Sequence, residues 1–100
     1  MKPVGLTVTV DAPMPEARDR ILGRVDRRLR SAGLTGREKN GAVDYRPKFI
    51  GLVIVWTVRR LQDEHVTFTF AEQGPVTEVR AAGRLRDRAH AEVTEALGGY

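Results

Sequence analysis

Hydrophobic and polar residues alternate along three stretches of this chain, at 4–11, 65–72 and 76–85. In the first stretch Leu6, Val8 and Val10 are separated by threonines. A period of two places successive side chains on opposite faces of a sheet, so each stretch predicts a half-buried β-strand. The turn residues Gln73-Gly74-Pro75 lie between the last two stretches, which predicts that these strands are antiparallel neighbours.

Two other stretches show the spacing of amphipathic helices. The first is predicted at 15–32, with Pro15 in its first turn and Gly33 just past its end. Its apolar stripe repeats every four residues and comprises Ala17, Ile21, Val25 and Leu29. The second helix is predicted at 87–97, where the pair Gly98-Gly99 ends it.

The middle of the chain is harder to assign. Residues 49–60 form the most apolar stretch, and their β-branched residues favour a strand, although a helix of this length is also conceivable. Residues 34–41 mix charges with Gly36, Asn40 and Gly41 and are expected to form a loop. Residues 42–45 are expected to form a short edge strand, because Pro47 interrupts a sheet ladder.

The predicted order is strand, helix, optional short strand, three strands and a helix. One hundred residues are enough for one hydrophobic core, so we expect a single domain over 1–100. The class expected is α+β: a two-layer sandwich in which two helices cover one face of a mainly antiparallel sheet of four or five strands. The face expected beneath the helices carries Leu6, Val8, Val10, Ile50, Leu52, Ile54, Trp56, Val58, Val66, Phe68, Phe70, Val79 and Ala81.

The opposite, outer face of the sheet is the best candidate for an interaction surface. Threonines and charged residues dominate it, yet 49–60 adds apolar side chains that a two-layer sandwich leaves uncovered. The residues expected on this surface are Phe49, Val53, Val55, Thr57, Thr67, Thr69 and Arg80. We therefore expect a homodimer or a protein partner on this face, unless 34–48 folds over the apolar residues.

The net charge of +4 permits weak, salt-dependent attraction to polyanions. The candidate contacts for such a polyanion lie on the first predicted helix and are Arg18, Arg20, Arg24, Arg27 and Arg28. The favoured interpretation is a solvated helix face with the ion pairs Glu16–Arg20 and Asp26–Arg30, so nucleic acid is an unlikely partner.

The chain shows no catalytic motif. It has no cysteine, one serine (Ser31) and two histidines (His65 and His90), which lack ligands at metal-binding spacing. The carboxylate pair Asp63-Glu64 is explained by the polarity of a turn. Gly33-Leu-Thr-Gly36 matches the Gly-x-x-Gly of KH domains but is interpreted as a helix cap followed by a turn. We expect no enzyme activity, no metal and no cofactor.

Two segments resemble START-like (polyketide cyclase/dehydrase) domains. They are the opening Thr-Val-Thr-Val-Asp-Ala-Pro at 7–13, which runs into a helix, and the stretch from Val66-Thr-Phe-Thr-Phe to Ala96-Leu97. The resemblance covers about 35 residues and implies a curved sheet around a C-terminal helix, with binding of an apolar ligand. It transfers no functional residue to this chain.

The expected function is therefore that of a small, soluble, non-enzymatic binding protein that self-associates through the outer sheet face. The alternatives are a carrier or sensor of a small apolar ligand and a weak nucleic-acid binder through the first helix. No stretch reaches the roughly 20 apolar residues of a membrane-spanning helix. The N-terminus has the pattern of a strand and not of a signal peptide, so a cytoplasmic location is expected.

Overall fold

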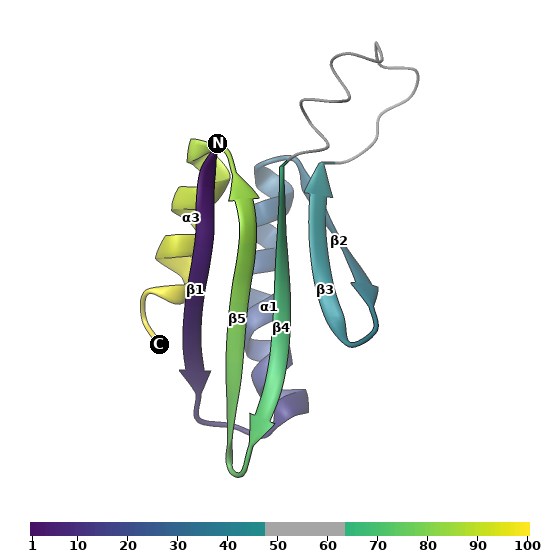
Figure 1. The fold of residues 1–100 in the computed structure, drawn as a ribbon, viewed down its shortest axis with the longest axis vertical. Helices are drawn as coiled ribbons and strands as arrows, with labels where there is room; N and C mark the ends of the chain where they lie inside the picture. The colour runs from purple at the N-terminus through teal and green to yellow at the C-terminus, as the bar shows by residue number, and fades with distance from the viewer. Residues whose placement is uncertain (48–63) are drawn as a thin grey trace.

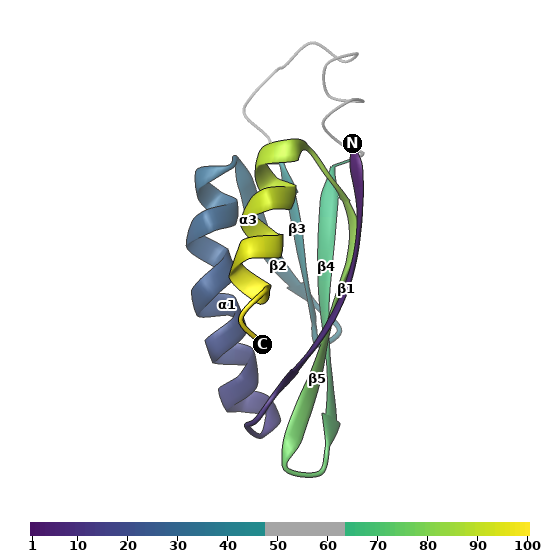
Figure 2. The ribbon, with the colours of Figure 1, turned by 90° about the vertical axis from the view of Figure 1, so that its left-hand side faces the viewer.

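The computed structural model describes residues 1–47 and 64–100. Within them, two helices pack on one face of a five-stranded antiparallel sheet, which confirms the predicted α+β sandwich (Figures 1 and 2). The elements in chain order are β1 (Lys2–Val10), α1 (Met14–Ser31), β2 (Leu34–Lys39), β3 (Ala42–Pro47), β4 (His65–Gln73), β5 (Val76–Leu85) and α3 (Asp87–Leu97).

The strands lie in the order β1-β5-β4-β3-β2, so β1 and β2 form the two edges of the sheet. β1 pairs with β5 along its whole length, from Lys2 opposite Leu85 to Val10 opposite Thr77. β4 and β5 form a hairpin around Gly74, whose positive φ of 66° suits a tight turn. The sheet therefore combines a long N-terminal edge strand with a short hairpin at the opposite edge.

Both helices follow the predicted apolar spacing. The stripe of α1 is fully buried, and Pro15 occupies its first turn without loss of an intrahelical hydrogen bond. Ala32 caps the C-terminus, and Gly33 follows with a φ of 88°, as expected of a residue just past a helix end. α3 buries the stripe Ala89, Val93, Ala96 and Leu97. Each helix is thus fixed by its apolar face.

The core lies between the helices and the inner face of the sheet. The large fully buried side chains include those of Ile21, Leu29, Tyr45, Phe68 and Leu97. Tyr45 and Phe68 meet edge to face, with ring centroids 5.7 Å apart. The predicted inner-face residues that the structure describes on β1, β4 and β5 all pack in or against this core.

The prediction of a loop at 34–41 is wrong, because residues Leu34–Lys39 form strand β2. Asn40 and Gly41, with φ values of 52° and 82°, form a tight turn into β3. Positive φ at both central residues is what a two-residue type I′ hairpin requires, and Asn-Gly is its commonest sequence. Because β2 pairs outside β3, the strand expected at 42–45 is present but does not lie at the edge of the sheet.

The strand expected at 49–60 lies outside the described residues. So do the predicted inner-face residues Ile50, Leu52, Ile54, Trp56 and Val58.

Candidate functional site

The outer face of the sheet is open in the described part of the chain, since both helices pack on the other face (Figure 2). Thr67, Thr69 and Arg80 lie on this open face as expected, with Thr67 half-buried and the other two exposed. Thr7 and Thr69 flank Arg80 from the neighbouring strands. The other residues of the expected surface lie outside the described residues and are Phe49, Val53, Val55 and Thr57.

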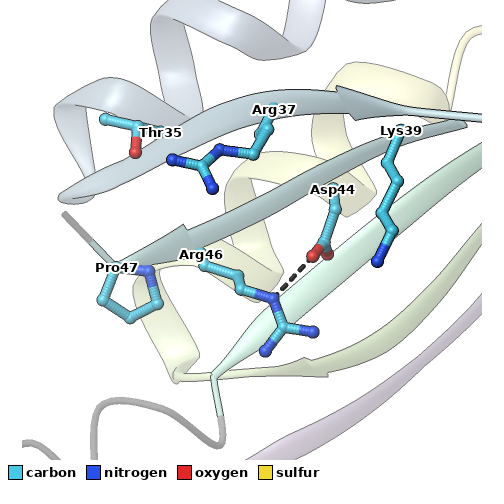
Figure 3. A pocket seen from close by; sticks show the side chains of 6 residues that line it. All are labelled: Thr35, Arg37, Lys39, Asp44, Arg46 and Pro47. Atoms are coloured by element: carbon cyan, nitrogen blue, oxygen red, sulfur yellow. Dashed lines mark hydrogen bonds and ion pairs between the residues drawn. The ribbon is translucent and has the colours of Figure 1, made fainter. Parts of the chain in front are cut away.

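A hollow of about 490 Å³ lies on this face over β2 and β3. Its lining is strongly basic and comprises Thr35, Arg37, Lys39, Asp44, Arg46 and Pro47 (Figure 3). Alternation along the two strands places Thr35, Arg37, Lys39, Asp44 and Arg46 on one face, because Arg37 lies opposite Asp44 and Thr35 lies opposite Arg46. The hairpin between β2 and β3 therefore builds the hollow.

Among the described residues that line the hollow, Asp44 is the only carboxylate, and it is already engaged. It accepts a hydrogen bond from Arg46 Nε and another, 3.0 Å long, from Thr67 Oγ1. Arg37 and Lys39 have no ion-pair or hydrogen-bond partner for their side chains among residues 1–47 and 64–100. The hollow thus presents two cations that the described chain does not neutralise.

The whole described outer face is positively charged. Its strands carry five cations against two carboxylates, leaving His65 out of the count. The cations are Arg37, Lys39, Arg46, Arg80 and Arg84, and the carboxylates are Asp44 and Glu78. Both carboxylates are ion-paired, with Arg46 and Arg80 respectively. The excess positive charge consequently belongs to Arg37, Lys39 and Arg84.

The arginines of α1 are arranged differently, because most of them have partners. Arg18 pairs with Glu38 of β2 at 2.8 Å, and its guanidinium lies 5.9 Å from the centre of the Phe70 ring. Arg20 pairs with Glu16 at 2.8 Å, as the i,i+4 spacing predicted.

The next turns of α1 face α3. Arg28 lies within 3.3 Å of Glu92 and 3.6 Å of Glu95. Arg24 donates to the Ala96 carbonyl at 3.4 Å, and its guanidinium lies 4.8 Å from the Tyr100 ring centre. Of the five arginines named from the sequence, only Arg27 lacks a partner in the part of the chain that the structure describes. Three of the five, Arg18, Arg24 and Arg28, therefore join α1 to another element, whereas the pair of Arg20 lies within α1.

Tyr45 anchors the floor of the β2–β3 hairpin to α1. Its side chain is 2% exposed, and its hydroxyl donates a 2.9 Å hydrogen bond to Asp26 Oδ1. Burial, and then the hydrogen bond to Asp26, raise the pKa of Tyr45 well above its ordinary value. The hydroxyl stays protonated and keeps the hairpin fixed against the helix.

No group of three or more His, Asp or Glu side chains within 1–47 and 64–100 could hold a metal ion. Glu64 is 5% exposed and accepts a hydrogen bond from the Arg86 backbone N–H, whereas Asp63 lies outside the described residues. None of the described helices is long and apolar enough to cross a membrane.

A second hollow, of about 290 Å³, opens at the Asn40-Gly41 end of the sandwich. Its lining includes the apolar side chains of Met14, Ala42 and Phe70. This partly apolar lining is what a site for a small apolar ligand would need.

Sequence reasoning missed the basic hollow because it took 34–41 as a loop. Arg37 and Lys39 are two residues apart and precede Asn-Gly, and the stretch after the turn contains Val43 and Tyr45. That combination is the short-range signal of a hairpin. Recognising it would have placed both cations on one face of an edge strand.

Comparison of the chain with protein families, with curated proteins and with solved structures finds no match. The chemistry of the described surface is therefore the basis for a functional proposal.

Proposed function

We propose that this protein is a binding module that receives an extended acidic segment of a partner protein along β2 and the adjoining basic hollow. The observation that carries the proposal is the pair Arg37 and Lys39, whose charges no described residue neutralises. Two residues apart on a strand, they point to the same face at a spacing of about 6.8 Å. Alternate carboxylates of an extended acidic segment have the same period, so both charge pairs can form at once.

The position of β2 supports this mode of binding. β2 is an edge strand, and β3 is its one strand neighbour in the described part of the chain. The backbone N–H and C=O groups on its other edge can therefore pair with another strand. Glu38 turns to the opposite face and pairs with Arg18, which leaves the outer side of the strand to the two cations. Backbone pairing would supply affinity, and the two cations would select acidic side chains.

A nucleic acid fits the described surface less well. Proteins that bind single strands stack bases on exposed aromatic side chains. The aromatic residues of the described strands, Tyr45, Phe68 and Phe70, all turn toward the helices. The α1 arginines named for a polyanion are, apart from Arg27, engaged within the fold.

A second copy that contacts the same face is also a weaker candidate for the described strands. Like charges on two copies of this face would oppose each other, since its cations outnumber its carboxylates. The expected self-association rests on Phe49, Val53 and Val55, which lie outside the described residues. An acidic partner suits the charge of the described surface better.

The test is binding of a fluorescently labelled peptide of alternating Glu and Thr, measured by anisotropy at low and high salt. We expect binding that weakens with salt, and about a tenfold loss for Arg37→Glu or Lys39→Glu, as for one charge-assisted contact. Arg27→Glu is the matched control, because it makes the same charge change at an exposed α1 residue with no described partner. It should bind like the original protein.

Three results would contradict the proposal. One is no binding at low salt, and another is an equal loss for Arg27→Glu. The third is tighter binding of a single-stranded oligonucleotide that depends on the same two residues, which would make the partner a nucleic acid. A peptide of alternating Lys and Thr should not bind and controls for non-specific adsorption.

A small apolar ligand is the second candidate function. The hollow beside Met14 and Phe70 is the observation in its favour, together with the START-like resemblance of the sequence. Arg18 already lies against the Phe70 ring, which makes this site less apolar than its lining suggests.

A further inference from the structure

The free edge of β1 lacks the features that usually protect an edge strand. From Val4 to Val10 it contains no charged residue and no proline, and its valines and threonines have high β-propensity. Natural edge strands are usually short, charged, bulged or interrupted by proline, because their unpaired backbone groups can add another strand. In the described part of the chain, β1 has β5 as its single strand neighbour.

The apolar side of β1 is also incompletely covered. Val4 and Val10 are buried, whereas Leu6 and Val8 between them are only half-buried. The short helix α3 lies alongside the N-terminal half of β1 and does not extend to the C-terminal end of the strand (Figures 1 and 2). The strand thus offers an open backbone edge with partly exposed apolar side chains beside it.

We propose that β1 is the contact strand of a homodimer, in which the β1 strands of two copies pair antiparallel around a two-fold axis at Thr7. The two sheets then become one continuous sheet with all helices on the same side. This interface is separate from the acidic-partner surface, which lies at the opposite edge of the sheet.

The register follows from the pattern of burial. A two-fold axis perpendicular to the sheet pairs residues on the same face, and centring it on Thr7 sets Leu6 opposite Val8 of the second copy. The interface therefore contains two Leu6–Val8 pairs, one on each side of the axis, and each pair covers two half-buried apolar side chains. The same register uses the whole uncharged run, since Val4 comes opposite Val10 and Gly5 opposite Thr9.

Charges at the strand ends favour a second copy as the occupant. In this register Lys2 of each copy comes opposite Ala12 of the other, next to Asp11, and Asp11 has no ion-pair partner among the described residues. Lys2 makes only an exposed contact with Asp87, at 3.6 Å, from which it can turn. The unpaired cations Arg37 and Lys39 are on the far edge of each sheet, so the two basic hollows do not approach each other.

Single cysteines test the register directly, because the natural chain has none and every disulfide must join two copies. At the two-fold axis the Cα atoms of Thr7 would be about 4.5–5.5 Å apart, within the range of a disulfide. We therefore expect Thr7→Cys to give a covalent dimer under mild oxidation. Thr9→Cys, on the same face of the same strand, should not, because the Cα atoms of the two copies of position 9 would be about 14 Å apart.

Mixing the variants adds a positive control for the register. Gly5 has open space where a side chain would begin, so Gly5→Cys is tolerated. An equimolar mixture of Gly5→Cys and Thr9→Cys should give crosslinked heterodimers. Equal crosslinking of Thr7→Cys and Thr9→Cys alone would overturn the proposed register.

Light scattering and sedimentation test the interface without modification. Thr7→Lys places two ammonium groups opposite each other at the axis and should weaken self-association at least about fivefold. Thr69→Lys is the matched control, because Thr69 is also exposed and flanks Arg80 from the other side. A strict monomer at all concentrations, or equal weakening by both variants with both folded by circular dichroism, would overturn the proposal.

Discussion

The two edge strands of the sheet, β1 and β2, differ in length and in charge. β1 is nine residues long, pairs with β5 throughout, and has no charge between Lys2 and Asp11. β2 is six residues long and carries Arg37, Glu38 and Lys39 in succession. A charged edge strand repels a second copy of itself and favours a partner of opposite charge. An uncharged edge strand of high β-propensity can instead pair with another uncharged strand.

The contrast extends to what holds each edge in place. β1 is held mainly by its long ladder and by the core side chains Val4 and Val10. β2 is held by a shorter ladder with β3 and by one buried core side chain, Leu34. The Arg18–Glu38 ion pair and the packing of Gly36 on Tyr45 add to this. We infer that β1 is held in place more rigidly than β2. A rigid edge suits pairing with a second copy at β1, and a less rigid edge suits binding of a variable partner segment at β2.

A substitution at Gly83 of β5 tests how strongly the β1 side contributes to stability, because Gly83 pairs with Val4 on one side and Val66 on the other. Its φ is 156°, and a Cβ there would lie 2.1 Å from the carbonyl oxygen of His65. We expect Gly83→Ala to lower the free energy of unfolding by about 3 kcal/mol or more, through backbone strain and overlap. Urea denaturation measures the loss.

Gly5→Ala is the control for that variant, because its Cβ would meet nothing within 4 Å. Its effect should stay within about 0.5 kcal/mol. A Gly83→Ala protein as stable as Gly5→Ala would show that the β1 side is less tightly built than its ladder indicates.

The β2 side can be probed in the same way at Gly36. A Cβ on Gly36 would lie 2.8 Å from the Tyr45 ring, which cannot move freely because its hydroxyl is bonded to Asp26. Gly36→Ala should cost about 2 kcal/mol, less than Gly83→Ala because the obstacle is a side chain and not a backbone carbonyl. The urea midpoints of the two variants give the comparison, and the reverse order would make β2 the firmer edge.

The smallest expected effect concerns the hydrogen bond between Tyr45 and Asp26. Tyr45→Phe removes it and should cost about 1 kcal/mol near neutral pH. The raised pKa of Tyr45 in the folded state means that its stabilisation is complete below about pH 10 and is lost as pH rises further, because only the unfolded chain releases the proton.

Thermal unfolding between pH 8 and pH 11 measures this dependence. The original protein should lose stability above pH 10 more steeply than Tyr45→Phe, by up to about 1.4 kcal/mol per pH unit. Parallel profiles for the two proteins would mean that Tyr45 ionises in the folded state and does not anchor the hairpin.

The elements with a regular pattern were predictable from the sequence. Strict alternation identified β1, β4 and β5, and a four-residue apolar spacing identified α1 and α3, since one side of each had to be buried. β2 was not recognised, because five of its six residues are polar or glycine and its strand state depends on pairing with β3. The role of Gly36 was invisible for the same reason, as it depends on where Tyr45 lies.

The candidate surface was likewise predictable only in part. The sequence alone placed Thr67, Thr69 and Arg80 on the open face, because side-chain direction in a strand alternates with residue number. It could not tell that Arg18, Arg20, Arg24 and Arg28 have partners whereas Arg37 and Lys39 have none in the described chain. Most of those partners, such as Glu38, Glu92 and Ala96, are distant in sequence.

The sequence by itself therefore determined the secondary structure of most elements and the face that each buries, because both depend on local periodicity and on the removal of apolar surface from water. Only the tertiary structure decided which strands became edges and which cations remained unpaired. Strand order and ion pairing depend on contacts between residues far apart in the chain, and no local pattern encodes them.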